Sequence, residues 1–83
     1  MDVVTDKVRE ILAVELRIEL DRIVADAKLR ADLGMDSVAA LNILFAAQEA
    51  FGIEGIEMTE LAGVATVGDI ESLVRKHVAD RPM

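Results

Sequence analysis

The chain has 83 residues, a hydrophobic fraction of 53%, only two aromatic residues and a formal net charge of −7. The absence of cysteine excludes disulfides and thiolate metal sites, and the acidity disfavours nucleic acid as a partner. No basic and apolar leader is visible, and no apolar run approaches the ~20 residues of a membrane span. We therefore expect a cytoplasmic monomer without stable membrane insertion, with a single domain over residues 1–83 and a frayed tail from about residue 79.

Acidic residues dominate the middle of the chain. Residues 31–74 hold no base and eight acids, whereas the two ends together hold all nine bases and the other eight acids. A negative electrostatic field of this kind steers basic partners toward a protein. The alternative interpretation is that the charge only keeps the protein in solution. The eight central acids are Asp32, Asp36, Glu49, Glu54, Glu57, Glu60, Asp69 and Glu71.

The first helix is predicted over residues 3–16, because apolar residues recur there at the spacing of one helical face and Asp2 precedes them as a potential N-cap. Residues 17–35 follow as a long loop with a short helical turn expected near residues 20–23. Apolar side chains are expected to pin this loop to the core. They are Ile18, Leu20, Ile23, Leu29 and Leu33.

The second helix is predicted to begin at Asp36 or Ser37 and to end at Phe51. Gly34 allows a tight turn before the helix, Asp36 can cap its free N–H groups, and Gly52 provides a stop. Its first apolar face consists of Ala40, Ile43, Leu44, Ala47 and Phe51, and a second apolar row consists of Val38, Leu41 and Phe45. A small bundle can hardly bury such a helix on all sides, so the second row indicates a surface reserved for a partner.

A short third helix is expected around residues 58–63, and a last helix is predicted to follow Thr66, with Asp69 bonding back to the cap. The inner face of this last helix is predicted to hold Val67, Ile70, Leu73, Val74 and Val78. His77 near its end is expected to interact with the helix dipole or to be solvated. The elements predict an all-α fold, a small four-helix bundle with three main helices and one short one.

Three short patterns accompany this helix layout. Gly34-x-Asp36-Ser37 precedes an apolar helix that ends in Glu49-x-Phe51-Gly52-Ile53, and Thr66-Val67-Gly68-Asp69 precedes another apolar helix. A serine in a first helical turn is common in itself. The combination, from Asp32 to Val78, resembles the acyl carrier protein family. The resemblance implies a four-helix bundle of acyl-carrier type with a long loop between helices one and two, and a carrier rather than an enzyme.

The resemblance also implies the chemistry of the site. Ser37 would carry a covalent 4′-phosphopantetheine arm, which a phosphopantetheinyl transferase moves from coenzyme A, and acyl groups would travel as thioesters on the arm's thiol. By matching position, Asp36 would take part in recognition by the transferase. Acyl-transferring and acyl-modifying enzymes would contact the surface around the second helix. The expected partner-binding residues are Met35, Val38, Leu41, Phe45 and Glu49, with Leu33 beside Met35.

The chain departs from the family pattern in two places. Val38 stands where the family usually has leucine, and the second helix carries one acid, Glu49, with Asn42 and Gln48 where acids are common. These departures favour a specialised carrier of a fatty-acid, lipid or polyketide pathway over a housekeeping one. A peptidyl or aryl carrier domain and an unmodified helical interaction module remain the alternatives.

Other chemistries fit the residues poorly. A serine hydrolase would need a Gly-x-Ser-x-Gly turn and a histidine base, but residue 39 is alanine and His77 is the only histidine. The chain has no cysteine and no oxygen-ligand loop of calcium-binding spacing, so no metal site is expected.

Overall fold

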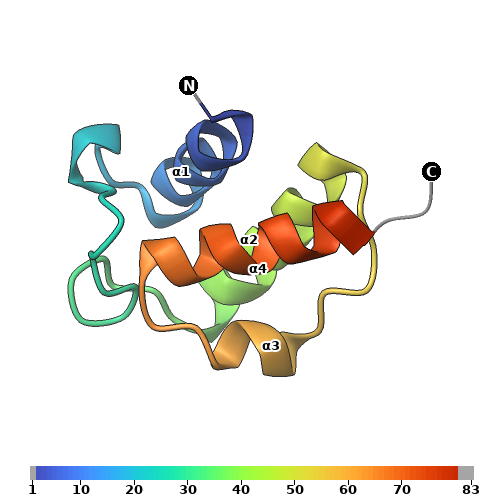
Figure 1. Cartoon of the computed structure of the whole chain (residues 1–83). Helices are drawn as coiled ribbons and strands as arrows, with labels where there is room; N and C mark the ends of the chain where they lie inside the picture. The colour runs from blue at the N-terminus through green and yellow to red at the C-terminus, as the bar shows by residue number, and fades with distance from the viewer. Residues whose placement is uncertain (1, 81–83) are drawn as a thin grey trace.

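The computed structural model describes residues 2–80, which form a small all-α bundle (Figure 1). Its elements are α1 (Val3–Leu16), a 3-10 turn η1 (Leu20–Arg22), α2 (Ser37–Phe51), α3 (Met58–Ala62) and α4 (Val67–Asp80). Within the described residues the only extended pairing is an isolated antiparallel bridge between Lys28 and Thr66. The predicted fold class is confirmed: α1, α2 and α4 are long helices, and α3 is the short one.

Side-chain caps define where the helices begin. At the start of α1, Asp2 Oδ1 accepts the N–H of Val4 at 3.0 Å. Before α4, the Thr66 hydroxyl accepts the N–H of Asp69 at 3.3 Å, and the Asp69 carboxylate accepts the N–H of Thr66 at 3.1 Å. The N–H groups of Ala65 and Thr66 hold the pKa of Asp69 below its ordinary value. Both predicted caps are confirmed, and they satisfy donors that a first helical turn leaves open.

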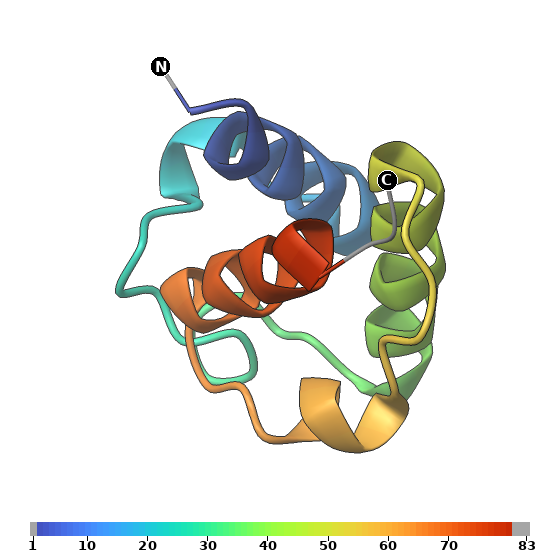
Figure 2. The same cartoon turned by 45° about the vertical axis from the view of Figure 1, so that its right-hand side comes forward.

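The helices enclose one aliphatic core. α1 packs against both α2 and α4, and α3 packs against α2 and α4 (Figures 1 and 2). Neither phenylalanine belongs to the fully buried set. The largest fully buried side chains are Val8, Leu12, Ile23, Leu29, Ile43, Val67 and Val74. The predicted inner faces of α1, α2 and α4 therefore do turn inward, and aliphatic residues supply most of the hydrophobic stabilisation.

The long loop between α1 and α2 follows the core closely. Its Leu29 donates a backbone hydrogen bond to the Ala65 carbonyl at 2.9 Å, so the loop runs beside the segment before α4. Ile23, Leu29 and Leu33 are buried as predicted. The prediction for Leu20 was wrong, since its side chain is 53% exposed. The single turn η1 buries none of its own residues, and Ile23, directly after it, fills the core instead.

The last helix is longer than expected. The predicted fraying from about residue 79 was wrong for residues 79 and 80, which both belong to α4. The half-buried Val78 packs against the core and holds the last turn of α4 in place. The rest of the predicted tail, residues 81–83, lies outside the described residues.

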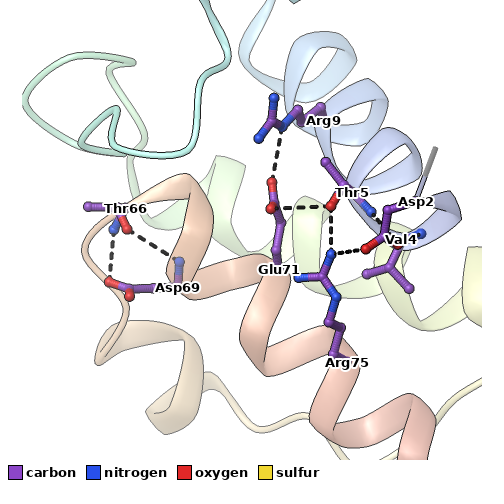
Figure 3. Close-up of polar contacts among 8 residues, drawn as sticks. All are labelled: Asp2, Val4, Thr5, Arg9, Thr66, Asp69, Glu71 and Arg75. Atoms are coloured by element: carbon purple, nitrogen blue, oxygen red, sulfur yellow. Dashed lines mark hydrogen bonds and ion pairs between the residues drawn. The ribbon is translucent and has the colours of Figure 1, made fainter.

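A polar network joins α1 to α4 (Figure 3). Glu71 is only 5% exposed, and its carboxylate accepts hydrogen bonds from Arg9 Nε at 3.0 Å and from the Thr5 hydroxyl at 3.4 Å. Arg75 donates to the Thr5 hydroxyl at 2.6 Å and to the Asp2 carboxylate, and the latter bond lowers the pKa of Asp2. Because a buried carboxylate requires such partners, Glu71 fixes how α1 and α4 sit against each other.

His77 contacts α3, although a solvated side chain was among the expectations. Its side chain is 17% exposed, and Nε2 lies 3.1 Å from Glu60 Oε2. The Glu57 N–H donates to Glu60 Oε1 at 3.1 Å within the capping box of α3. This bond and, second to it, the contact with His77 lower the pKa of Glu60. His77 therefore connects the last turns of α4 to the short helix α3.

Candidate functional site

The turn before α2 presents Ser37 as the first residue of the helix. Gly34 has a left-handed backbone with φ of +72°, which glycine adopts without strain, and the Met35 N–H donates to the Leu29 carbonyl at 2.9 Å. Asp36 follows in an extended conformation as the N-cap. Ser37 is exposed, so its hydroxyl is accessible to another protein.

Hydrogen bonding at this helix end leaves room for an anion. Asp36 Oδ1 accepts the N–H of Ala39 at 2.8 Å, and the Asp36 carbonyl accepts the N–H of Ala40 at 2.9 Å. The N–H groups of Ser37 and Val38 have no partner within the described part of the chain. Free N–H groups at a helix N-terminus, together with the helix dipole, favour a phosphate by roughly 0.3–1 kcal/mol at an exposed site. The residues present therefore fit a phosphodiester on the Ser37 hydroxyl.

Three apolar side chains lie exposed on α2 and form what we call the α2 strip: Val38, Leu41 and Phe45. Their exposed fractions are 70%, 39% and 58%, respectively. The alternative that α2 is buried on all sides is therefore wrong. The core side of the helix holds Ala40, Ile43, Leu44 and Ala47, all buried. At about 100° per residue the strip lies on the opposite side of α2 from these residues.

Two further residues were expected beside the strip. Glu49 is exposed and lies about one helical turn beyond Phe45, in the carboxyl half of α2. Met35, in contrast, is only 4% exposed, and the nearby Leu33 is 5% exposed. The expectation that Met35 and Leu33 flank the site at the surface was wrong in this respect. Their side chains belong to the core because the loop before Asp36 needs apolar anchors.

The sequence did not identify Met58 as a surface residue of this region. Its side chain is 40% exposed on α3, which packs against α2 and lies beside the amino-terminal half of that helix (Figures 1 and 2). A five-residue helix has too few turns to show an apolar periodicity. The one signal available in the sequence was the methionine itself, since methionine adapts to differently shaped binding surfaces.

Metal binding and membrane spanning find no support among the described residues. No group of three or more His, Cys, Asp and Glu side chains in residues 2–80 is arranged to hold a metal ion. Over the same residues, none of the helices has both the length and the apolar character needed to cross a bilayer.

Comparison with known proteins agrees with this geometry. The family described as phosphopantetheine attachment site matches residues 6–74. An acyl carrier protein of Saccharopolyspora erythraea is 34% identical over 74 residues, which cover 89% of this chain and 77% of that protein. An acyl carrier protein of Akkermansia muciniphila is 34% identical over 73 residues, which cover 88% of this chain and 90% of that protein.

A third relative is much larger. One component of the polyunsaturated fatty acid synthase of a Thraustochytrium species is 32% identical over 72 residues, which cover 87% of this chain but 3% of the synthase component. The matched residues 6–74 include the capped turn, the exposed serine and all of α2. The chain thus belongs to the acyl carrier protein family, whose members hold acyl groups on a covalent 4′-phosphopantetheine and are carriers, not enzymes.

Proposed function

We propose that Ser37 is the attachment point of 4′-phosphopantetheine and that the chain carries acyl intermediates as thioesters in a specialised fatty-acid, lipid or polyketide pathway. The observation that carries this proposal is the position of Ser37. It is exposed, it opens a helix whose first two N–H groups are free, and it adjoins an exposed apolar strip. The attached group supplies a flexible arm with a terminal thiol.

The residues around Ser37 have separable tasks in the attachment step. In this step the Ser37 hydroxyl oxygen bonds to the pantetheine-bearing phosphorus of coenzyme A and the pyrophosphate P–O bond breaks. Adenosine 3′,5′-bisphosphate leaves, the hydroxyl proton passes to the transferase, and Ser37 retains phosphopantetheine as a phosphodiester. Asp36 holds the first turn of α2 through its bond to Ala39, so the serine is presented on a fixed backbone. The N–H groups of Ser37 and Val38, which are unpaired within residues 2–80, and the helix dipole give this end of α2 a partial positive charge that would favour the new negative charge.

The surface of α2 supports a specialised carrier. Glu49 is the only acid between Ser37 and Phe51. Asn42 is exposed without charge, whereas Gln48 has a structural task, since its Oε1 accepts the N–H of Ile56 at 3.2 Å. Rim charges mainly set encounter rates, and buried apolar anchors carry much of the affinity. We infer that partners bind the α2 strip chiefly through apolar contact.

Two alternatives to an acyl carrier are compatible with an exposed serine at the start of α2. A peptidyl or aryl carrier would have the same capped serine, and the names of the relatives, two acyl carrier proteins and a component of a polyunsaturated fatty acid synthase, favour acyl cargo. An unmodified interaction module would use the α2 strip equally well. It would not account for the match of residues 6–74 to the phosphopantetheine attachment family.

Intact-mass analysis separates these alternatives. The purified chain is incubated with coenzyme A and a broad-specificity phosphopantetheinyl transferase, and we expect its mass to rise by one phosphopantetheine group. Ser37→Ala must abolish the gain, while Ser72→Ala, a change at an exposed serine on α4, must leave it intact. No gain in the unchanged chain, or a gain that survives Ser37→Ala, would overturn the proposal. The group carried by protein isolated from its native cell then identifies acyl, peptidyl or aryl cargo.

A further inference from the structure

We propose that the hollow between α1 and η1 is a second docking surface and that it binds a basic, amphipathic segment of a partner protein. This proposal goes beyond the carrier function and does not depend on a modified Ser37. Residues of both elements line the hollow, which has a volume of about 560 Å³. They are Asp6, Arg9, Glu10, Leu20, Asp21 and Val24, with Ile23.

The floor and rim of the hollow offer apolar surface. Ile23 is 1% exposed and closes the floor, whereas Leu20 and Val24 are 53% and 45% exposed on the rim. Exposed apolar side chains are normal when they occur singly, but these two border the same hollow. The partner segment must therefore bring at least one apolar side chain to cover them.

The charges around the hollow specify the rest of the partner. Asp6, Glu10 and Asp21 are all exposed, and Arg9 is the one base among the lining residues. Arg9 is already paired, since its Nε donates to the buried Glu71 carboxylate at 3.0 Å. Three carboxylates are thus left without a compensating base in the lining of the hollow. A surface of this sign attracts cationic side chains.

The neighbouring surface extends the same character. A second hollow of about 400 Å³ shares Asp21 and Val24 with the first, and Asp26, Asp32 and Arg22 also line it, so acids again outnumber bases. These carboxylates do not form a metal site, because residues 2–80 contain no group of three or more suitable ligands. A second copy of this chain, at a net charge of −7, would be repelled. A basic segment of another protein is the occupant that matches both the apolar rim and the charge.

The location gives this surface a use of its own. η1 and α2 lie on opposite sides of the molecule, with η1 at the left and α2 at the right in Figure 2. A segment bound at η1 leaves the α2 strip free for an enzyme. Such a contact would hold the carrier close to the protein that supplies the basic segment. The α2 strip would then be at a higher effective concentration for a second binding surface on that same protein or on a protein bound to it.

An NMR titration of the unmodified Ser37→Ala chain tests the proposal, so the outcome is independent of phosphopantetheine attachment. The probe is a blocked 14-residue amphipathic peptide of leucine and lysine, and a peptide with glutamate in place of lysine is the charge control. We expect the largest amide shifts in residues 20–24 and around Asp6 and Glu10. Leu20→Ala should weaken peptide binding about fivefold, because about half of the leucine side chain is available for the peptide to cover. Asp21→Asn should weaken it about threefold, because one exposed negative charge is lost.

Matched variants distinguish binding in the hollow from non-specific attraction of a basic peptide to an acidic protein. Val14→Ala removes an apolar side chain that is 74% exposed elsewhere on α1, and Glu54→Gln removes an exposed acid outside both hollows. Both changes should alter the dissociation constant by less than twofold, and the spectra themselves report whether each variant is folded. Any one of three results would overturn the proposal. The largest amide shifts could fall on α2, Asp21→Asn and Glu54→Gln could weaken peptide binding equally, or the glutamate peptide could bind as tightly as the lysine peptide.

Discussion

Phe45→Ala provides a quantitative test of how partners bind α2. The Phe45 side chain is 58% exposed. A fully accessible phenylalanine offers roughly 200 Å², so roughly 115 Å² remains for a partner to cover. At about 25 cal/mol per Å² this area corresponds to about 3 kcal/mol, and the Cβ that alanine retains, with incomplete burial, lowers the figure to about 2 kcal/mol. The Michaelis constant of a partner enzyme for this carrier should then rise about thirtyfold.

Glu49→Gln is the matched comparison, because Glu49 is the acid of the same helix surface. An exposed charge pair contributes at most about 1 kcal/mol, or about fivefold, and that contribution weakens with salt. The assay is steady-state modification by a phosphopantetheinyl transferase at varied carrier concentration, which needs no knowledge of the pathway. Val14→Ala controls for an exposed apolar residue on another helix. A larger loss for Glu49→Gln than for Phe45→Ala would refute apolar recognition.

Three further predictions concern the fold. Gly52→Ala should cost about 1 kcal/mol in urea denaturation, because Gly52 ends α2 with φ of 62°, and an unchanged midpoint would contradict this. Glu71→Ala should cost about 2 kcal/mol by the same measurement, since it leaves a half-buried arginine unpaired, whereas Glu10→Ala at the exposed side of α1 should cost under about 0.5 kcal/mol. Hydrogen bonds lower the pKa values of Asp2, Glu60 and Asp69 below their ordinary values of 3.8 to 4.5. The ionised carboxylates therefore stabilise the fold at pH values above 4.5, and this stabilisation is lost as the pH falls through the lowered pKa values of the folded state. The free energy of unfolding should therefore drop between pH 6 and pH 3, and by a smaller amount in Asp69→Asn.

The helices were predictable because each one carries its own signals. The apolar spacing of residues 3–16 and the cap at Asp2 lie within a few positions of each other, and so do Asp36, Gly52 and the apolar faces between them. Local patterns of this kind act within one helix, and the observed bounds of α1 and α2 agree with them. The same local reasoning distinguished the buried side of α2 from the α2 strip.

Contacts between distant segments could not be predicted in this way. Glu71 lies four positions after Val67 and three before Val74, on the inner face of α4, where the apolar pattern predicts no ionised side chain. It is buried there because Arg9 and Thr5 on α1 supply its partners from more than 60 positions away. His77 is similar, since its contact with Glu60 depends on where α3 lies. No pattern within either helix contains this information.

The burial of Met35 clarifies how the candidate site is organised. Because its N–H bonds to Leu29 and its side chain is in the core, the backbone just before Asp36 is fixed by the interior of the protein. Ser37 is therefore positioned by buried residues, whereas Val38 and Phe45, one and eight positions later, contribute little to the core and remain free for partners. If Ser37 is the attachment point, as proposed, attachment geometry and partner recognition depend on different residues of one short segment. Substitutions in the α2 strip should then change partner binding without displacing Ser37 from the start of α2.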